Sequence, residues 1–313
     1  MTALDMIIEK IVLNNLRYNS SEKILVVADD AKRELAKHFL KAAQTITEYS
    51  KLVSMPARKE HGEEPTQEVE KEMLDSDIIL IVTSKSLTHT KARIKASEEG
   101  AKIASMPDIT DEIIQRCVDI DYKAMEMIIN KIVDKLRTTK QVRVKTEKGT
   151  DITFIVPKIV MDDTGDYSKK GDFGNLPAGE VFFAPVNASG RLVIDGSMLD
   201  MKLKEPVEVL IQDNYAVGFG SNRISQELKA KLNKVSQDAF NLAEFGIGTN
   251  PKAIITGNIL EDEKVLGTVH FAFGNNASFG GKVNVPIHLD GVILKPTVYF
   301  DDKIIMKEGK MLL

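Results

Sequence analysis

The sequence has only one cysteine, Cys117, so it cannot form an internal disulfide. Cys117 lies in ITDEIIQRCVDI, whose apolar residues recur at helical spacing, and we interpret it as a buried core thiol rather than a reactive one. Because chains without disulfides are typical of reducing compartments, we expect a cytoplasmic protein.

Long hydrophobic runs and an excess of one charge are also absent. No stretch approaches the ~20 consecutive apolar residues that a membrane helix needs. The opening segment MTALDMIIEKIVLNNL spaces its apolar residues as a helix does, which argues against a signal peptide. The 42 basic and 46 acidic residues nearly balance, so we expect no nucleic-acid partner. We further expect no membrane partner, a small peptide or other small molecule as substrate, and a homodimeric assembly.

Glycines are missing where a nucleotide-binding turn would need them. The segment VVADDAKREL, between the first predicted strand and the next helix, has Asp29 and Asp30 where phosphate-contacting glycines belong. The segment GNNASFGGKV is not a phosphate-binding loop either, because Val283 stands where a magnesium-binding Ser or Thr is needed. We therefore expect no nucleotide cofactor.

The first half of the chain alternates strand-like and helix-like segments. Short apolar strands are predicted at 23–29, 51–56, 77–84 and 101–107, with helices at 31–43, 68–74, 89–99 and within 110–136. Strands that are apolar throughout and separated by helices predict a parallel sheet covered on both faces.

The second half is richer in short β segments. QVRVKT and DITFIVP predict a β-hairpin with its turn at Lys148–Gly149, and the segment 225–241 predicts a helix capped by Ser225. With 313 residues, the chain is long enough for two domains. The predicted fold class is α/β, with a parallel-sheet α/β domain over 1–138 and a mainly antiparallel β (α+β) metal-binding catalytic domain over 139–313.

Two histidines and an aspartate stand out in this second half. His288 and Asp290 in VPIHLDGV are two residues apart on a predicted strand, so their side chains point to the same face. His270, in GTVHFAFG, has apolar neighbours that suggest burial. One such histidine alone is usually a satisfied core residue, but the three together favour a metal site.

Three glutamates strengthen this hypothesis. Glu180 in LPAGEVFFAPV and Glu244 in NLAEFGIGTNP stand among apolar residues and glycines, where an exposed charge gains nothing. Glu263 lies seven residues before His270 in an acidic run. A buried carboxylate needs a counter-charge, which a divalent metal or a structural ion pair can supply.

The segments NLPAGEVFFAPV, NLAEFGIGTNP, EDEKVLGTVHFAFG and VPIHLDGV, in this order, resemble the thermophilic metallo-aminopeptidase family of the aminopeptidase T and S type. The resemblance implies two divalent metals, zinc, cobalt or manganese. Carried over motif by motif, it implies that the metal ligands are Glu180, Glu244, Glu263, His270, His288 and Asp290.

One position departs from the family. Its catalytic tyrosine, seven residues after the motif histidine, corresponds here to Ala277, and Phe279 close by has no hydroxyl group. The resemblance therefore supports the metal site more strongly than it supports the peptidase reaction. We assign no catalytic residue beyond the ligands.

Three functions remain open from the sequence. The first is an aminopeptidase-like hydrolase that removes N-terminal residues with a metal-activated water. The second is a ring-cleaving dioxygenase, because the family also resembles dihydroxypyridine dioxygenases, whose iron is held by two histidines and one aspartate. His270, His288 and Asp290 supply that set, and Fe(II) would be the metal. The third is a metal-binding protein without catalysis.

Overall fold

The computed structural model describes residues 2–313, and the chain forms two compact units. One unit comprises the chain up to Ile120 together with Gly165–Ala178, and the other comprises Asp121–Thr164 and Gly179–Leu313. The predicted α/β class is correct, since the first unit holds a parallel sheet and the second holds antiparallel sheets. The division into two domains with a boundary at residue 138 remains a prediction.

The first unit is built on a five-stranded parallel sheet. Its strand order is β2 (Ser50–Met55), β1 (Ile24–Asp29), β3 (Ile78–Val82), β4 (Lys102–Ser105) and β8 (Phe173–Asn175). The first four are the predicted strands. The fifth, β8, comes from a segment whose local pattern does not predict a strand, and it forms because the edge of β4 offers it backbone partners.

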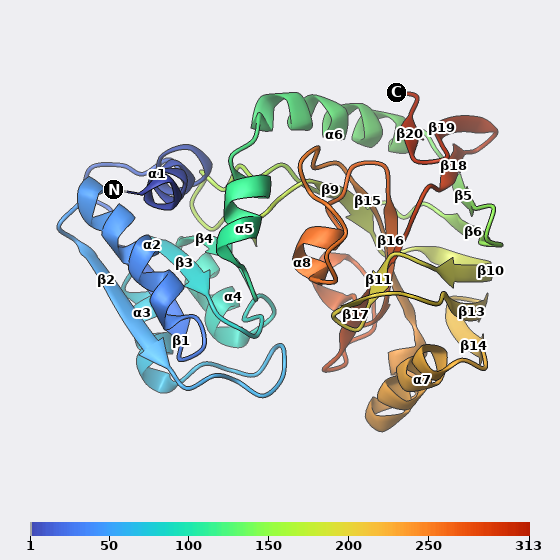
Figure 1. The fold of residues 1–313 in the computed structure, drawn as a ribbon, viewed down its shortest axis with the longest axis horizontal. Helices are drawn as coiled ribbons and strands as arrows, with labels where there is room; N and C mark the ends of the chain where they lie inside the picture. Colours follow the sequence, from blue (N-terminus) through green and yellow to red (C-terminus); the bar gives the residue numbers. More distant parts are fainter. Residues whose placement is uncertain (1) are drawn as a thin grey trace. The chain divides into compact units, whose positions relative to one another are not determined.

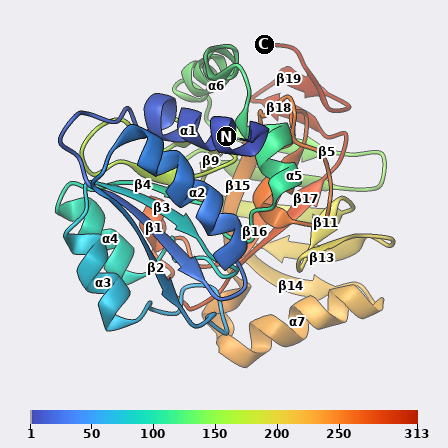
Figure 2. The same cartoon turned by 60° about the vertical axis from the view of Figure 1, so that its left-hand side comes forward.

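Helices cover both faces of this sheet. Helix α1 (Ala3–Lys10), its continuation η1 (Ile11–Asn15) and α2 (Arg33–Ile46) lie on one face, and α3 (Gln67–Leu74) and α4 (Lys91–Glu98) on the other (Figure 2). Short turns α5 (Asp111–Ile113) and η2 (Ile114–Val118) follow, and Cys117 in η2 is buried, as expected.

Between β1 and α2, the carboxylate of Asp29 accepts hydrogen bonds of 2.6 Å from the backbone and the hydroxyl of Ser84. These hydrogen bonds fix the side chain of Asp29 at the end of β1.

The second unit contains two antiparallel sheets. The larger has the order β14 (Tyr215–Phe219), β13 (Val207–Gln212), β10 (Val186–Ile194), β6 (Asp151–Ile155), β5 (Gln141–Lys145), β18 (Thr297–Phe300), β19 (Lys303–Lys307), β20 (Lys310–Met311). The other has the order β12 (Met201–Lys202), β11 (Ser197–Met198), β17 (His288–Ile293), β16 (Val269–Gly274), β15 (Leu242–Gly248), β9 (Glu180–Phe183), β7 (Met161–Asp163). The predicted hairpin is β5–β6, with Gly149 at φ +105° in its turn.

A cluster of phenylalanine rings joins the two sheets. Phe154 of β6 lies with its ring centroid 4.8 Å from Phe245 of β15, 5.8 Å from Phe271 of β16 and 6.1 Å from Phe183 of β9. Since side chains alternate between the faces of a strand, the neighbours of these phenylalanines point to the opposite face. That face carries the polar residues described below.

Helices complete the second unit (Figure 1): α6 (Tyr122–Leu136), α7 (Arg223–Val235) and the short turns η3 (Gln237–Phe240), α8 (Ile259–Asp262) and η4 (Ala277–Phe279). The predicted cap of α7 is wrong by three residues. Asn222 is the cap, because its backbone is extended and its side-chain oxygen accepts from the Ser225 amide at 2.9 Å. Among the described helices, none is both long and apolar enough to span a bilayer.

Candidate metal centre

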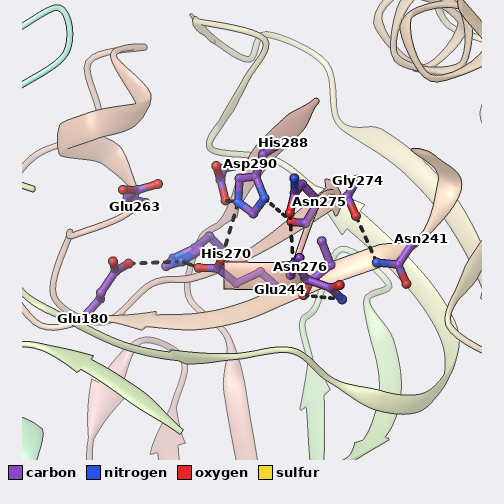
Figure 3. Close-up of polar contacts among 12 residues, drawn as sticks. Glu180, Asn241, Glu244, Glu263, His270, Gly274, Asn275, Asn276, His288 and Asp290 are labelled. Carbon is purple, nitrogen blue, oxygen red and sulfur yellow. Dashed lines mark hydrogen bonds and ion pairs between the residues drawn. The ribbon is translucent and has the colours of Figure 1, made fainter. Parts of the chain in front are cut away.

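The six residues predicted as metal ligands lie together on one face of the smaller sheet of the second unit (Figure 3). Four adjacent strands, β9, β15, β16 and β17, carry five of them, and the sixth follows the short helix α8. The five are Glu180, Glu244, His270, His288 and Asp290; the sixth is Glu263. Period-two alternation places them here, because Phe245 and Phe271, which directly follow Glu244 and His270, point into the core.

His270 is fully buried at the centre of the cluster. Its Nε2 atom lies 3.2 Å from Oε1 of Glu244 and 3.3 Å from Oε2 of Glu180. Both carboxylates are nearly buried, so this histidine faces two negative groups with little solvent to screen them.

His288 is oriented from its other side by the backbone. Its Nδ1 atom lies 2.8 Å from the carbonyl oxygen of Asn275, which can only accept, so Nδ1 carries the proton. In the neutral ring, Nε2 then bears the lone pair, and it lies 3.4 Å from Glu244 Oε2 and 3.4 Å from Asp290 Oδ1. A hydrogen bond of this kind is what fixes the tautomer of a metal-binding histidine.

Three overlapping groups of side chains bring ligand atoms within 4.8 Å of one another. They are Glu180–Glu244–His270, Glu244–His288–Asp290 and Glu263–His270–Asp290. Two buried carboxylate oxygens, Glu180 Oε2 and Asp290 Oδ1, accept no hydrogen bond from any described residue. Buried acceptors normally have partners, so these oxygens and the imidazoles are chemically suited to a divalent cation.

The pKa values of these residues also indicate that the cluster favours a bound cation. Burial opposes ionisation of Glu244, but its hydrogen bonds with His270 and His288 outweigh burial and hold the pKa of its carboxyl well below the usual range. Burial opposes protonation of His270, yet Glu244 and Glu180 raise the pKa of its imidazole to about 9. Burial likewise opposes protonation of His288, but Asp290 and Glu244 raise its pKa. The site therefore attracts positive charge, as protons or as a metal ion.

Glu263 is held at the edge of the cluster by Lys264, a residue that sequence reasoning missed. Burial raises the pKa of Glu263 to about 8, while Lys264 acts in the opposite direction. The ammonium group of Lys264 lies 2.6 Å from Glu263 Oε1 and 2.5 Å from Glu180 Oε1. The only sequence signal for this role is the position of Lys264 directly after Glu263 in EDEK.

The loop after β16 contains the position of the family tyrosine. Ala277 is exposed in η4, and its amide donates to Asn275 Oδ1. Phe279 of the same turn is buried; its ring lies edge-on to His288 at 6.0 Å and to Phe182 at 5.6 Å. The loop thus presents an aromatic ring beside the metal-ligand cluster. Neither Phe279 nor Phe182 was predicted as a site residue.

The sequence matches the family model for 2,5-dihydroxypyridine 5,6-dioxygenase (NicX) over residues 5–313. The chain belongs to this family. No curated protein matches the sequence. Solved structures share the fold of this NicX-family chain, among them the following two. The 2,5-dihydroxypyridine dioxygenase from Pseudomonas putida KT2440 aligns with TM-score 0.84 and 18% identity, covering 99% of this chain and 96% of its own. AmpT from Thermus thermophilus aligns with TM-score 0.75 and 15% identity over 99% of both chains.

Membership of the NicX family corrects the leading sequence interpretation. The prediction of an aminopeptidase-like hydrolase, and with it of a metalloprotease, is wrong, because the family model that covers nearly the whole chain is that of a dioxygenase. The family resemblance itself is correct in part, since the likeness to AmpT extends over the whole fold. Ala277 already departed from the peptidase pattern.

Proposed function

We propose that this protein is a ring-cleaving dioxygenase for a small dihydroxylated nitrogen heterocycle of the 2,5-dihydroxypyridine type. The family assignment supports the reaction class. The observation that carries the proposal is the position of His270, His288 and Asp290 on one face of adjacent strands β16 and β17, with Asp290 in a close group with each histidine. Two histidines and one carboxylate are the ligand set of many non-haem Fe(II) oxygenases.

Asp290 connects the two histidines of this set. It belongs to one close group with His270 and to another with His288, while its Oδ1 atom accepts no hydrogen bond from the described residues. We propose His270, His288 and Asp290 as the ligands of Fe(II), which would supply oxygen activation beside the bound ring. The backbone carbonyl of Asn275 holds His288 in the tautomer that ligation requires.

The remaining residues of the site suit an aromatic diol. Phe279 and Phe182 provide apolar ring surfaces that bind a planar heterocycle and exclude water. Glu244 is close to both histidines, and its carboxylate can accept a hydrogen bond from a ring hydroxyl group as the substrate binds. The cluster thus combines a candidate metal site, a hydrogen-bond acceptor and an aromatic surface.

The test is oxygen consumption by protein that has been freed of metal and reloaded with Fe(II) without air. With 2,5-dihydroxypyridine we expect loss of the ring absorbance with uptake of one O₂ per ring, and both atoms of ¹⁸O₂ in the product. Protein loaded with Zn(II), which has no redox chemistry, is the metal control.

Two histidine variants complete the test. His288→Ala should be inactive, whereas His38→Ala should keep its activity, because His38 pairs with Asp5 in the first unit. Absence of oxygen uptake by the iron-loaded native chain, across a panel of hydroxylated pyridines and benzenes, would overturn the proposal.

A further inference from the structure

Lys264 is a fully buried lysine whose ammonium group lies between two of the predicted metal ligands. It is 0% exposed, and its Nζ atom lies 2.5 Å from Glu180 Oε1 and 2.6 Å from Glu263 Oε1. Each of these glutamates belongs to a group that could hold a metal ion. A positive charge of the protein itself is therefore present on this side of the cluster.

The backbone fixes the position of this lysine. The amide of Lys264 donates to the Glu261 carbonyl at 3.0 Å, and its own carbonyl accepts from the Asn250 amide at 2.8 Å. Gly248 of β15 allows the close approach, because a Cβ atom there would lie 2.8 Å from the Lys264 carbonyl carbon and 2.9 Å from the Glu263 carbonyl oxygen. The ammonium group is therefore anchored beside Glu180 rather than free to swing away.

The three candidate ligand groups differ in their relation to Lys264. The group with Glu180 and the group with Glu263 each include a carboxylate that Lys264 already binds. The group Glu244–His288–Asp290 includes neither of these glutamates, and the close pair His270–Asp290 needs neither of them. A divalent ion on Glu180 or Glu263 would share a carboxylate with an ammonium group only a few Å away. In a buried site such like charges repel strongly, since little solvent screens them.

We infer that Lys264 takes the place of a second metal ion and limits this centre to the one divalent metal held by His270, His288 and Asp290. The inference rests on the proposed metal centre and assigns Lys264 the role of excluding a second ion from it. It differs from the two-metal centre that the aminopeptidase resemblance implied. It also assigns Glu180 and Glu263 a role as ion-pair partners of Lys264 rather than as metal ligands.

The experiment counts metal ions in native protein and in Lys264→Met. Both proteins are stripped with a chelator, loaded with excess Mn(II) and separated from free metal, and manganese per chain is measured together with the electron paramagnetic resonance spectrum. We expect one uncoupled Mn(II) per native chain. In Lys264→Met we expect two spin-coupled Mn(II) ions, with the second site binding about 100-fold more tightly than in the native chain.

Lys102→Met is the matched control. Lys102 is also buried, and its Nζ atom lies 2.9 Å from Glu22 Oε2 and 2.7 Å from the Leu16 carbonyl, all within the first unit. This variant loses a buried ion pair of similar kind but should still bind one manganese ion. A second ion in Lys102→Met as well would mean that loosening the fold, not losing the Lys264 charge, opens the extra site, and it would overturn the inference.

Two other outcomes would contradict the inference. They are a spin-coupled pair of ions in the native chain, and a single ion in a Lys264→Met or Lys264→Gln variant that melts cooperatively. If neither variant folds, the number of manganese ions per native chain and the spectrum of the native protein still test the inference. The result is separable from the proposed reaction: one bound ion without ring cleavage would count against the dioxygenase alone, and ring cleavage by a two-metal centre would count against the role of Lys264 alone.

Discussion

Gly246 lies directly opposite His270 in the pairing of β15 with β16, and a Cβ atom at Gly246 would stand 2.1 Å from the Nε2 atom of His270. The imidazole can therefore lie against the neighbouring strand only because residue 246 has no side chain. This contact explains the glycine two residues after Glu244 in the EFGIG segment.

Replacement of Gly246 should weaken metal binding without unfolding the protein. In Gly246→Ala the added methyl group must displace the His270 ring, and displaced ligand geometry typically costs about 10–100-fold in metal affinity. Competition with a chromophoric chelator measures this change. Gly218→Ala is the control, since its Cβ would meet only Leu210, at 3.3 Å, in the other sheet. Equal affinities for native protein and Gly246→Ala would refute the packing argument.

The charge of Asp290 should be essential for the metal centre. Asp290→Asn keeps the shape of the side chain but removes the negative charge, and we expect a loss of at least about 100-fold in metal affinity. Asp195 offers a control in the same unit, because its buried carboxylate accepts from the Leu294 amide and pairs with Lys148. Asp195→Asn should lower the free energy of unfolding by about 1–3 kcal/mol and leave metal affinity unchanged. Isothermal titration and thermal melts separate the two effects.

Metal binding should depend steeply on pH. The pKa of His270 in the metal-free protein is raised from 6.5 to about 9, so its protonated form stabilises the metal-free fold fully below pH 6.5. That contribution is lost as the pH rises through about 9. A metal binds only neutral imidazole, so apparent affinity should fall as the pH is lowered from 9 towards 6.

Proton release gives the direct measurement of this effect. At pH 7.5, calorimetric titrations in buffers of different ionisation enthalpy should show release of about one to two protons per metal, from His270 and His288. Binding without proton release would show that the histidines are neutral in the metal-free protein or do not bind the metal.

Phe279 should contribute to recognition of an aromatic substrate. Its ring lies 6.0 Å from His288, so Phe279→Leu removes an aromatic surface at the metal-ligand cluster while keeping the site apolar. We expect KM for the ring substrate to rise by about 3–10-fold, in line with the 0.5–1.5 kcal/mol of an aromatic pair, with metal content unchanged. The control is Phe240→Leu, because Phe240 packs on Phe219 at 5.9 Å, on β14 of the other sheet. An unchanged KM in Phe279→Leu would exclude the ring as a recognition element.

The sequence alone determined the architecture of the first half, because apolar strands and amphipathic helices are local patterns that each segment carries in itself. Four of the five strands of the parallel sheet were predicted in this way. Strand β8 was not, since FGN in a polar loop becomes a strand only through backbone pairing with β4. The cap of α7 was misjudged for a similar reason: both Asn222 and Ser225 can cap a helix, and only the observed hydrogen bond decides between them.

The sequence also singled out the six candidate ligands, because acidic and histidine side chains among apolar residues need a partner wherever they fold. Their role as ligands stays a proposal. Only the tertiary structure decided that β9, β15, β16 and β17 are neighbours, and thus that Glu180 and Asp290 share one face. Only the tertiary structure placed Lys264 between Glu180 and Glu263 and the Asn275 carbonyl behind His288. Such contacts join segments far apart along the chain, and no local pattern records which distant charge or carbonyl will meet a given side chain.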